Sequence, residues 1–311
     1  MLSVTEAQAQ QTTAGLLPGA EAWYLRTTDR AGELFVYEIG CGEPVVVLHG
    51  GPGADFDYIL PVADGLTFDY RFVFYDQRGS LRSRVRPDSI SMAKHVQDLN
   101  DLRRALGVER IHLLSHSAGT MLAFEYLQAY PEHVGHVVLV GALPHKNGAP
   151  YFDEEYAALW EGLQDEAQAF YEREAVQREL RRVGVDDSLK TPKQRSQIAL
   201  IRQVGAETFH VERWRERIPL RINNQAGQLT RASTNFTYDY SDLLADHAFP
   251  VTVINGEYDY TVGPRGSPLW MRLKETRAPD LSVIVIPDAS HNVWYDDPAR
   301  FRAALRKALP E

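Results

Sequence analysis

The stretch LLSHSAGTM, from Leu113 to Met121, contains the first candidate for chemistry, Ser117. A buried-type strand pattern precedes this serine and a helix pattern follows it. A nucleophilic serine at such a sharp turn needs small residues two positions before and two positions after it. Gly119 meets the second condition, and Ser115 stands where glycine is usual. The pattern predicts that Ser117 is a nucleophile, the alternative being a serine that only caps the helix.

A serine hydroxyl becomes a good nucleophile only when a base takes its proton. Of the ten histidines, His291 is the best placed, because its segment DASHN follows the last strand pattern and precedes the last helix pattern. The other ring nitrogen of the base needs an acidic partner. Asp259 follows the strand pattern at 251–254. It is preferred over Glu257, because the turn at Gly256 carries the chain over before Asp259 is reached. Asp288 is close to His291 on the same loop and is interpreted as a turn residue.

The segment HGGPG, from His49 to Gly53, follows another strand pattern and could hold a negatively charged oxygen. We predict that the backbone N–H groups of Gly51 and Ala118 form this oxyanion hole. Such donors contribute about 2.7–4 kcal/mol each in a transition state. His49 and Gly50 are candidate substrate-binding residues in the same segment. The alternative is a plain glycine turn.

Strand and helix patterns alternate along the chain in a way that would bring these segments together. Strand patterns occur at 23–27, 34–39, 44–48, 72–75, 111–114, 137–140, 251–254 and 281–286, and amphipathic helix patterns at 92–106, 118–130 and 297–309. Apolar strands that alternate with helices are typical of a parallel sheet covered on both faces. The sequence therefore predicts an α/β fold with a mostly parallel, twisted sheet and helices on both of its faces.

About 100 residues interrupt this alternation with helix-like, polar sequence. Residues 145–247 are predicted to form a helical cap, with helices at 151–163 and 166–183, inserted at the carboxyl edge of the sheet where such folds bind ligands. The core domain would then comprise 21–144 and 248–311. Residues 1–20 are predicted to be a flexible N-terminal arm.

The composition of the chain argues against some classes of partner and indicates a cellular location. The chain has 311 residues and a formal net charge of −9, with 42 acidic and 33 basic residues. No basic stripe is visible, which argues against a nucleic-acid partner. The single cysteine, Cys41, cannot form an intrachain disulfide. No signal-peptide pattern and no apolar run of membrane-spanning length occurs, so we predict a cytoplasmic protein without a membrane partner.

Five segments together resemble a known family: HGGPG at 49–53, YDQRGS at 75–80, the turn around Ser117, GEYD at 256–259 and the His291 loop. They resemble the α/β-hydrolase superfamily with an inserted cap and, more closely, its prolyl-iminopeptidase-like branch. The resemblance implies a serine aminopeptidase that releases N-terminal residues, often proline, from small peptides. It implies no metal and no organic cofactor, and a small molecule or short peptide as the partner.

Three departures from the family pattern bear on this interpretation, namely Ser115, Leu81 after the DQRG segment, and Tyr260. Some members of the branch have at the position of Tyr260 a glutamate that holds the free amine of the substrate. An ammonium group in a dry pocket needs carboxylate partners. Cap glutamates such as Glu154, Glu155 and Glu161 could supply them, or they could be surface charges.

Further candidates and alternatives stay open on sequence alone. Glu257, Tyr260 and Trp294 are candidate substrate-binding residues near the predicted acid and base. Asp76 and Arg78 are interpreted as a structural turn pair. The same catalytic residues could serve an ester, an amide or a lactone, and a binding protein without chemistry is the third alternative. The sequence does not predict the oligomeric state.

Overall fold

The computed structural model describes residues 19–152, 154, 157–158, 163–246, 249–261 and 266–310. Of the predicted N-terminal arm, residues 1–18 lie outside this part, and Ala20 already belongs to the first strand. Every predicted strand is present in one eight-stranded sheet of order β1-β2-β4-β3-β5-β6-β9-β10. The strands are β1 (Ala20–Arg26), β2 (Glu33–Gly40), β3 (Pro44–Leu48), β4 (Arg71–Tyr75), β5 (Ile111–His116), β6 (Val134–Val140), β9 (Val251–Gly256) and β10 (Ser282–Ile286).

The sheet is mostly parallel, as predicted. Strand β2 pairs antiparallel with both β1 and β4, whereas the strands from β4 to β10 in the sheet order run parallel. Strand β3 is buried along its whole length. Val46 and Leu48 belong to the apolar cluster on one face of the sheet, and Val45 and Val47 to the cluster on the other. Such a strand is apolar at every position because both of its faces are covered.

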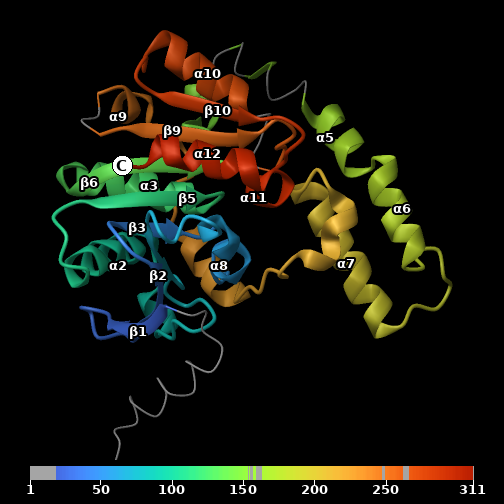
Figure 1. Cartoon of the computed structure of the whole chain (residues 1–311), viewed down its shortest axis with the longest axis horizontal. Coiled ribbons are helices and arrows are strands. Elements are labelled where there is room, and N and C mark those ends of the chain that lie inside the picture. Colours follow the sequence, from blue (N-terminus) through green and yellow to red (C-terminus); the bar gives the residue numbers. More distant parts are fainter. Residues whose placement is uncertain are drawn as a thin grey trace, which may run out of the picture.

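Helices cover both faces of the sheet (Figure 1). One apolar cluster includes residues of α2 (Met92–Ala105), α3 (Gly119–Ala129), α9 (Ser241–Ala245) and α10 (Gly266–Thr276). The other includes residues of the 3-10 helix η2 (Asp57–Ala63), α11 (Val293–Asp296) and α12 (Pro298–Ala308). The predicted helices at 92–106, 118–130 and 297–309 are confirmed as α2, α3 and α12.

The range predicted for the cap contains two kinds of segment. Helices α5 (Leu163–Tyr171), α6 (Glu174–Arg182) and α7 (Pro192–Glu207) stand to one side of the sheet (Figure 1), and residues from α6 to the 3-10 helix η6 (Val211–Glu216) share a small apolar cluster. Helix α8 (Asn224–Ala232) packs on the core, where Thr230 hydrogen-bonds His95 at 3.0 Å. Two short strands, β7 (Lys146–Asn147) and β8 (Tyr238–Asp239), also pair within this range.

The predicted cap helix at 166–183 is two helices, because the chain breaks at Arg173. The guanidinium of Arg173 donates to the carbonyl oxygens of Phe170, Gly205, Thr208 and Phe209. These contacts to a distant segment fix the break, and no local pattern in the sequence reveals them. Most of the helix predicted at 151–163 lies outside the described residues. In the described part of the chain, no helix has the length and apolar content needed to span a bilayer.

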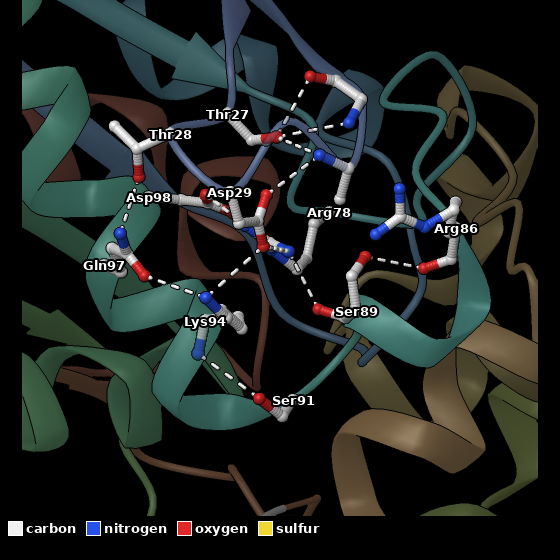
Figure 2. A network of polar contacts seen from close by, with 12 residues as sticks. Thr27, Thr28, Asp29, Arg78, Arg86, Ser89, Ser91, Lys94, Gln97 and Asp98 are labelled. Atoms are coloured by element: carbon white, nitrogen blue, oxygen red, sulfur yellow. Dashed lines mark hydrogen bonds and ion pairs between the residues drawn. The ribbon is translucent and has the colours of Figure 1, made fainter.

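Arg78 of the DQRG segment connects several segments of the core domain (Figure 2). The guanidinium of Arg78 donates to Asp98 at 2.7 and 2.6 Å, to Asp29 at 3.1 Å and to the carbonyl oxygen of Ser89 at 2.8 Å. The Asp76 carboxylate accepts instead from Arg82, at 2.7 Å. These contacts agree with the interpretation of Asp76 and Arg78 as structural turn residues, although each is bonded to another residue and not to the other.

Candidate active site

Ser117 lies on a sharp turn between β5 and α3. It is one of three described non-glycine residues with a positive φ, +53°. Left-handed backbone is unfavourable for a serine, and strain of this kind persists only where the surroundings enforce it. A Cβ at Gly119 would lie 2.4 Å from the carbonyl oxygen of Leu48, so a side chain is excluded there. The crossing of α3 over β3 therefore explains the small residue that the sequence motif requires.

Ser115, where glycine is usual, is accommodated without displacing the turn. Its side chain is fully buried, and its hydroxyl donates to the carbonyl oxygen of Val138 on the neighbouring strand at 3.4 Å. The hydroxyl thus has a partner, as a buried polar group requires. Leu81, the second departure, is exposed at the end of the DQRG turn.

His291 and Asp259 are in contact at the carboxyl ends of β10 and β9. The Nδ1 atom of His291 lies 2.9 Å from Oδ2 of Asp259, and both residues are buried. The other oxygen, Oδ1 of Asp259, accepts from the backbone N–H of Thr261 at 3.0 Å. Asp288 is an exposed turn residue with φ +51°, as predicted. Glu257 accepts from the backbone N–H of Asp288 at 3.4 Å and does not line the pocket described next.

Ser117 and His291 line the same small pocket, of about 130 Å³. Its walls come from the core domain and from the cap: Gly50, Gly51, Tyr58, His116, Ser117, Gln203, Glu207, Arg217, Ile218, Leu220, Thr261, His291 and Asn292. The described side chains of Ser117 and His291 are not hydrogen-bonded to each other. Catalytic hydrogen bonds are often long without substrate and shorten when it binds.

A larger pocket, of about 510 Å³, lies at the opposite edge of the sheet, where β3, β5 and β6 begin. It is lined by Glu43, His112 and His136 among others, and His112 hydrogen-bonds Glu43 at 2.8 Å. Open α/β sheets bind their ligands at the carboxyl ends of the strands. The smaller pocket, which has the strained serine, is therefore the candidate active site.

Two backbone donors are available beside Ser117. In the described part of the chain, nothing accepts a hydrogen bond from the N–H groups of Gly51 and Ala118. Gly51 lines the pocket with φ +66°. Gly50 donates its N–H to the hydroxyl of Tyr58 at 2.7 Å, which holds the glycine segment in place. The arrangement has the donors that an oxyanion hole needs.

His49, a predicted substrate-binding residue, does not line the pocket, whereas His116 does. His49 accepts at Nε2 from the backbone N–H of Gln77 at 3.1 Å and lies beneath the glycine segment, away from the pocket wall. His116 lines the pocket, with its ring centroid 4.4 Å from that of His291. Its Nδ1 atom accepts from the hydroxyl of Tyr58 at 2.8 Å.

None of the predicted acidic or aromatic substrate-binding residues that the structure describes lines the pocket. Glu154 is exposed, and Glu155 and Glu161 lie outside the described residues. Tyr260 donates its hydroxyl to Glu166 of α5 at 3.2 Å. Trp294 packs edge-on against His116, 4.8 Å between ring centroids, behind the pocket wall.

Several polar residues that sequence reasoning missed line the pocket, among them Glu207, Arg217 and Asn292. Glu207 accepts from Nδ2 of Asn292 at 3.1 Å and from Nε2 of Gln203 at 3.3 Å. Arg217 Nη2 lies 3.7 Å from Oε2 of Glu207. One local signal for Glu207 exists: it is an acid in the last turn of α7, where the helix dipole disfavours negative charge.

No metal site accompanies these groups in the described ranges of the chain, which contain no cluster of three or more His, Cys, Asp or Glu side chains able to hold an ion. A family model for the alpha/beta hydrolase fold matches residues 43–298, most of the chain. The chain belongs to this family.

Its relatives support the prolyl-iminopeptidase-like branch. This hydrolase is 22% identical over 275 residues to a proline iminopeptidase of Saccharolobus solfataricus, covering 88% of this chain and 86% of the relative. It is 36% identical to a proline iminopeptidase of Clostridium botulinum over 139 residues, 43% of each chain. A solved proline iminopeptidase-related protein from Thermus thermophilus has a TM-score of 0.61 at 24% identity, covering 93% of this chain and 97% of that one.

An esterase from Thermogutta terrifontis has the same fold, with a TM-score of 0.61 at 21% identity over 92% of this chain and 97% of that one. At these identities the likeness to solved structures shows the fold alone. The fold is shared by proteins of different activity, so the substrate must be argued from the residues of the pocket.

The two histidines of the hydrolase pocket have pKa values that are shifted in opposite directions. Burial lowers the pKa of His291, but the carboxylates of Asp259 and Glu207 outweigh it, so that the pKa is raised above its usual value. Burial and the neighbouring His291 hold the pKa of His116 well below its usual range. His116 is therefore neutral at pH 7, whereas His291 takes up a proton more readily than an unperturbed histidine.

Proposed function

We propose that this hydrolase works through an acyl-enzyme on Ser117, with His291 as the general base and Asp259 as its partner. One observation carries the proposal. Ser117 is held in a strained backbone conformation at the wall of the same pocket as His291, whose other nitrogen is 2.9 Å from Asp259. A nucleophile, a base and a group that orients the base are the parts that acyl transfer requires.

In this mechanism Nε2 of His291 takes the proton from Ser117 while Oγ attacks the substrate carbonyl. The carbonyl oxygen becomes negatively charged, and the N–H groups of Gly51 and Ala118 stabilise it. The protonated His291 then gives its proton to the leaving group, and the acyl-enzyme remains. His291 then takes a proton from a water molecule, which attacks the acyl carbonyl, and gives this proton to Oγ of Ser117 as the acyl group leaves.

The substrate that the pocket fits best has a free amino group, as in a short peptide that loses its N-terminal residue. Glu207 is the one carboxylate residue among the described residues that line the pocket with Ser117. The Oδ1 atom of Asn292 is buried and has no hydrogen-bond partner in the described part of the chain. An ammonium group needs such acceptors in a dry site. The proline iminopeptidases among the relatives are consistent with this substrate class.

A second candidate, hydrolysis of an uncharged ester, amide or lactone, is favoured by one observation. Arg217 lies 3.7 Å from Glu207, so the two charges partly neutralise each other and leave the pocket without net charge. A neutral pocket does not require a charged substrate.

A substrate panel separates the two candidates. Arylamides of proline, alanine and leucine are compared with their N-blocked forms and with short-chain esters. We expect the wild-type protein to hydrolyse only the free-amine substrates briskly. The variant Glu207→Gln should reduce kcat/KM for these substrates at least about tenfold. The matched control is Glu212→Gln, an exposed cap glutamate. Equal turnover of blocked and free substrates would contradict the aminopeptidase proposal and favour the second candidate.

The proposed nucleophile is tested separately with a fluorophosphonate probe. We expect the probe to label the wild-type protein and not the variant Ser117→Ala. A wild-type protein that resists labelling and hydrolyses nothing in the panel would instead be a binding protein with the hydrolase fold.

A further inference from the structure

The guanidinium of Arg217 is buried in the pocket with most of its donors unused. Arg217 is 8% exposed. Its Nη1 atom donates to the hydroxyl of Thr208 at 2.8 Å, and its charged plane lies 3.7 Å from the ring centre of Tyr295. Its Nε atom has no hydrogen-bond partner among the described atoms, and Nη2 is beyond hydrogen-bond distance of Glu207. A guanidinium has five N–H donors in a fixed planar fork, which suits a carboxylate.

Glu207 does not use up this donor capacity, because its nearest oxygen is 3.7 Å from Nη2 of Arg217. Asn292 and Gln203 both donate to Glu207, which draws the carboxylate toward α7 and the His291 loop. The donation from Nδ2 of Asn292 also assigns its amide, so Oδ1 is the orphan acceptor. Both residues line the pocket, Arg217 with unused donors and Asn292 with an unused acceptor. Buried polar groups without partners are rare in folded proteins, and a ligand can satisfy them.

The opposite charges of Arg217 and Glu207 determine what kind of ligand fits both residues. A substrate carboxylate alone at Arg217 would lie close to the carboxylate of Glu207 and be repelled. An ammonium alone at Glu207 would lie close to the guanidinium of Arg217. A substrate that has one charge of each sign keeps the pocket neutral and gives each buried charge an opposite partner, which low-dielectric sites require.

We propose that Arg217 binds the free C-terminal carboxylate of a dipeptide whose ammonium group binds Glu207 and Asn292. This inference rests on the proposed aminopeptidase function and narrows it to unblocked dipeptides. In a dipeptide the ammonium lies one Cα away from the scissile carbonyl, and the carboxylate lies one Cα beyond the scissile nitrogen. Both charged groups therefore flank the bond that Ser117 attacks. The pocket volume of about 130 Å³ suits a substrate of this size.

The test compares three substrates with the same N-terminal residue: the dipeptide, its C-terminal amide, and the arylamide. We expect the wild-type protein to hydrolyse the dipeptide with a kcat/KM at least about tenfold above that of its amide, chiefly through KM. The variant Arg217→Gln should bring this ratio close to one, and Arg217→Lys should keep part of it. The matched control, Arg215→Gln, changes an exposed arginine of the nearby 3-10 helix η6 and should leave the ratio as in the wild type.

Product inhibition gives a second measurement that does not need a folded variant. The leaving amino acid should inhibit hydrolysis of the arylamide at least about tenfold more strongly than its amide does. Equal kcat/KM for the dipeptide and its amide, with normal hydrolysis of the free-amine arylamide, would overturn the inference and leave the proposed function standing. A protein that hydrolyses no free-amine substrate would overturn both.

Discussion

Arg78 and Arg217 are two buried arginines in the same chain, and their surroundings differ in one respect. Arg78 is 1% exposed, and each of its three nitrogen atoms donates to Asp98, Asp29 or the carbonyl oxygen of Ser89 (Figure 2). Arg217 is 8% exposed and makes one hydrogen bond, to Thr208, among the described residues. The two arginines are thus almost equally buried, and they differ in the number of hydrogen-bond acceptors around the guanidinium.

The two pKa values move in opposite directions for this reason. Burial alone lowers the pKa of an arginine. For Arg78, the hydrogen bonds and charges of Asp98 and Asp29 outweigh burial and raise the pKa. For Arg217, burial dominates over Tyr295 and Glu207 and the pKa is lowered. A buried cation with all its acceptors stabilises the fold around it, whereas one that lacks them is a favourable place for an anionic ligand.

The regions around the two arginines differ in the same way. The network around Arg78 joins α2 to the loops after β1 and β4, and the pocket around Arg217 joins the cap to the strand ends that hold Ser117 and His291. We expect substitutions in the pocket to change activity with little effect on stability, and substitutions in the network to do the reverse. The following variants test this separation.

Ser117→Ala should have the largest effect. Removal of the nucleophile should lower kcat by about 10⁶-fold, equivalent to about 8 kcal/mol in the transition state. The free energy of unfolding should change by less than about 1 kcal/mol, because Ser117 makes no side-chain contact on which the fold depends. Steady-state kinetics and urea unfolding check both values. The control Ser188→Ala, at an exposed cap serine, should alter neither, and an active Ser117→Ala protein would remove the serine from the mechanism.

Asp259→Asn should have the next largest effect and should also move the pH profile. Loss of the carboxylate that orients His291 should lower kcat by about 10⁴-fold. His291 must be neutral to accept a proton, so activity falls as the pH drops through its pKa. Because Asp259 raises that pKa in the wild type, the acidic limb of kcat/KM should lie above its usual position for histidine and shift to lower pH in the variant. An unshifted limb would show that another group controls it.

Arg78→Met should act on stability instead. Removal of one partner from a buried ion pair leaves the Asp98 carboxylate buried without its cation and should cost about 3–5 kcal/mol of unfolding free energy. The double variant Arg78→Met/Asp98→Leu should recover part of this loss, because no unpaired charge remains. At urea concentrations below the unfolding transition, the kcat of the folded Arg78→Met protein should stay within about threefold of the wild-type kcat. A loss of kcat without a loss of stability would show that the two regions are not separate.

The different natures of these regions also explain what the sequence could predict. The strands, the turn at Ser117 and the pairing of Asp259 with His291 follow local signals, since each residue comes at a strand end that the apolar patterns mark. The contacts of Arg78 with Asp98 and of Asp76 with Arg82 were not predictable, because several acids compete for each arginine. Arg217 and Asn292 reach the pocket only through the packing of the cap on the core, which no spacing in the sequence encodes.

Arg217→Met should have a small effect on stability, and it is the direct counterpart of Arg78→Met. The wild-type arginine is buried with one hydrogen bond to a described residue and a contact with the ring of Tyr295, and its replacement by methionine removes a desolvated charge and keeps an apolar side chain beside that ring. Glu207 keeps its hydrogen bonds from Asn292 and Gln203, so it is not left without partners. We expect the free energy of unfolding to fall by less than about 1 kcal/mol or to rise, as is common where a functional site is destabilising. If urea unfolding instead showed a loss as large as that of Arg78→Met, Arg217 would be part of the scaffold, and the difference in acceptors between the two arginines would not indicate a difference in role.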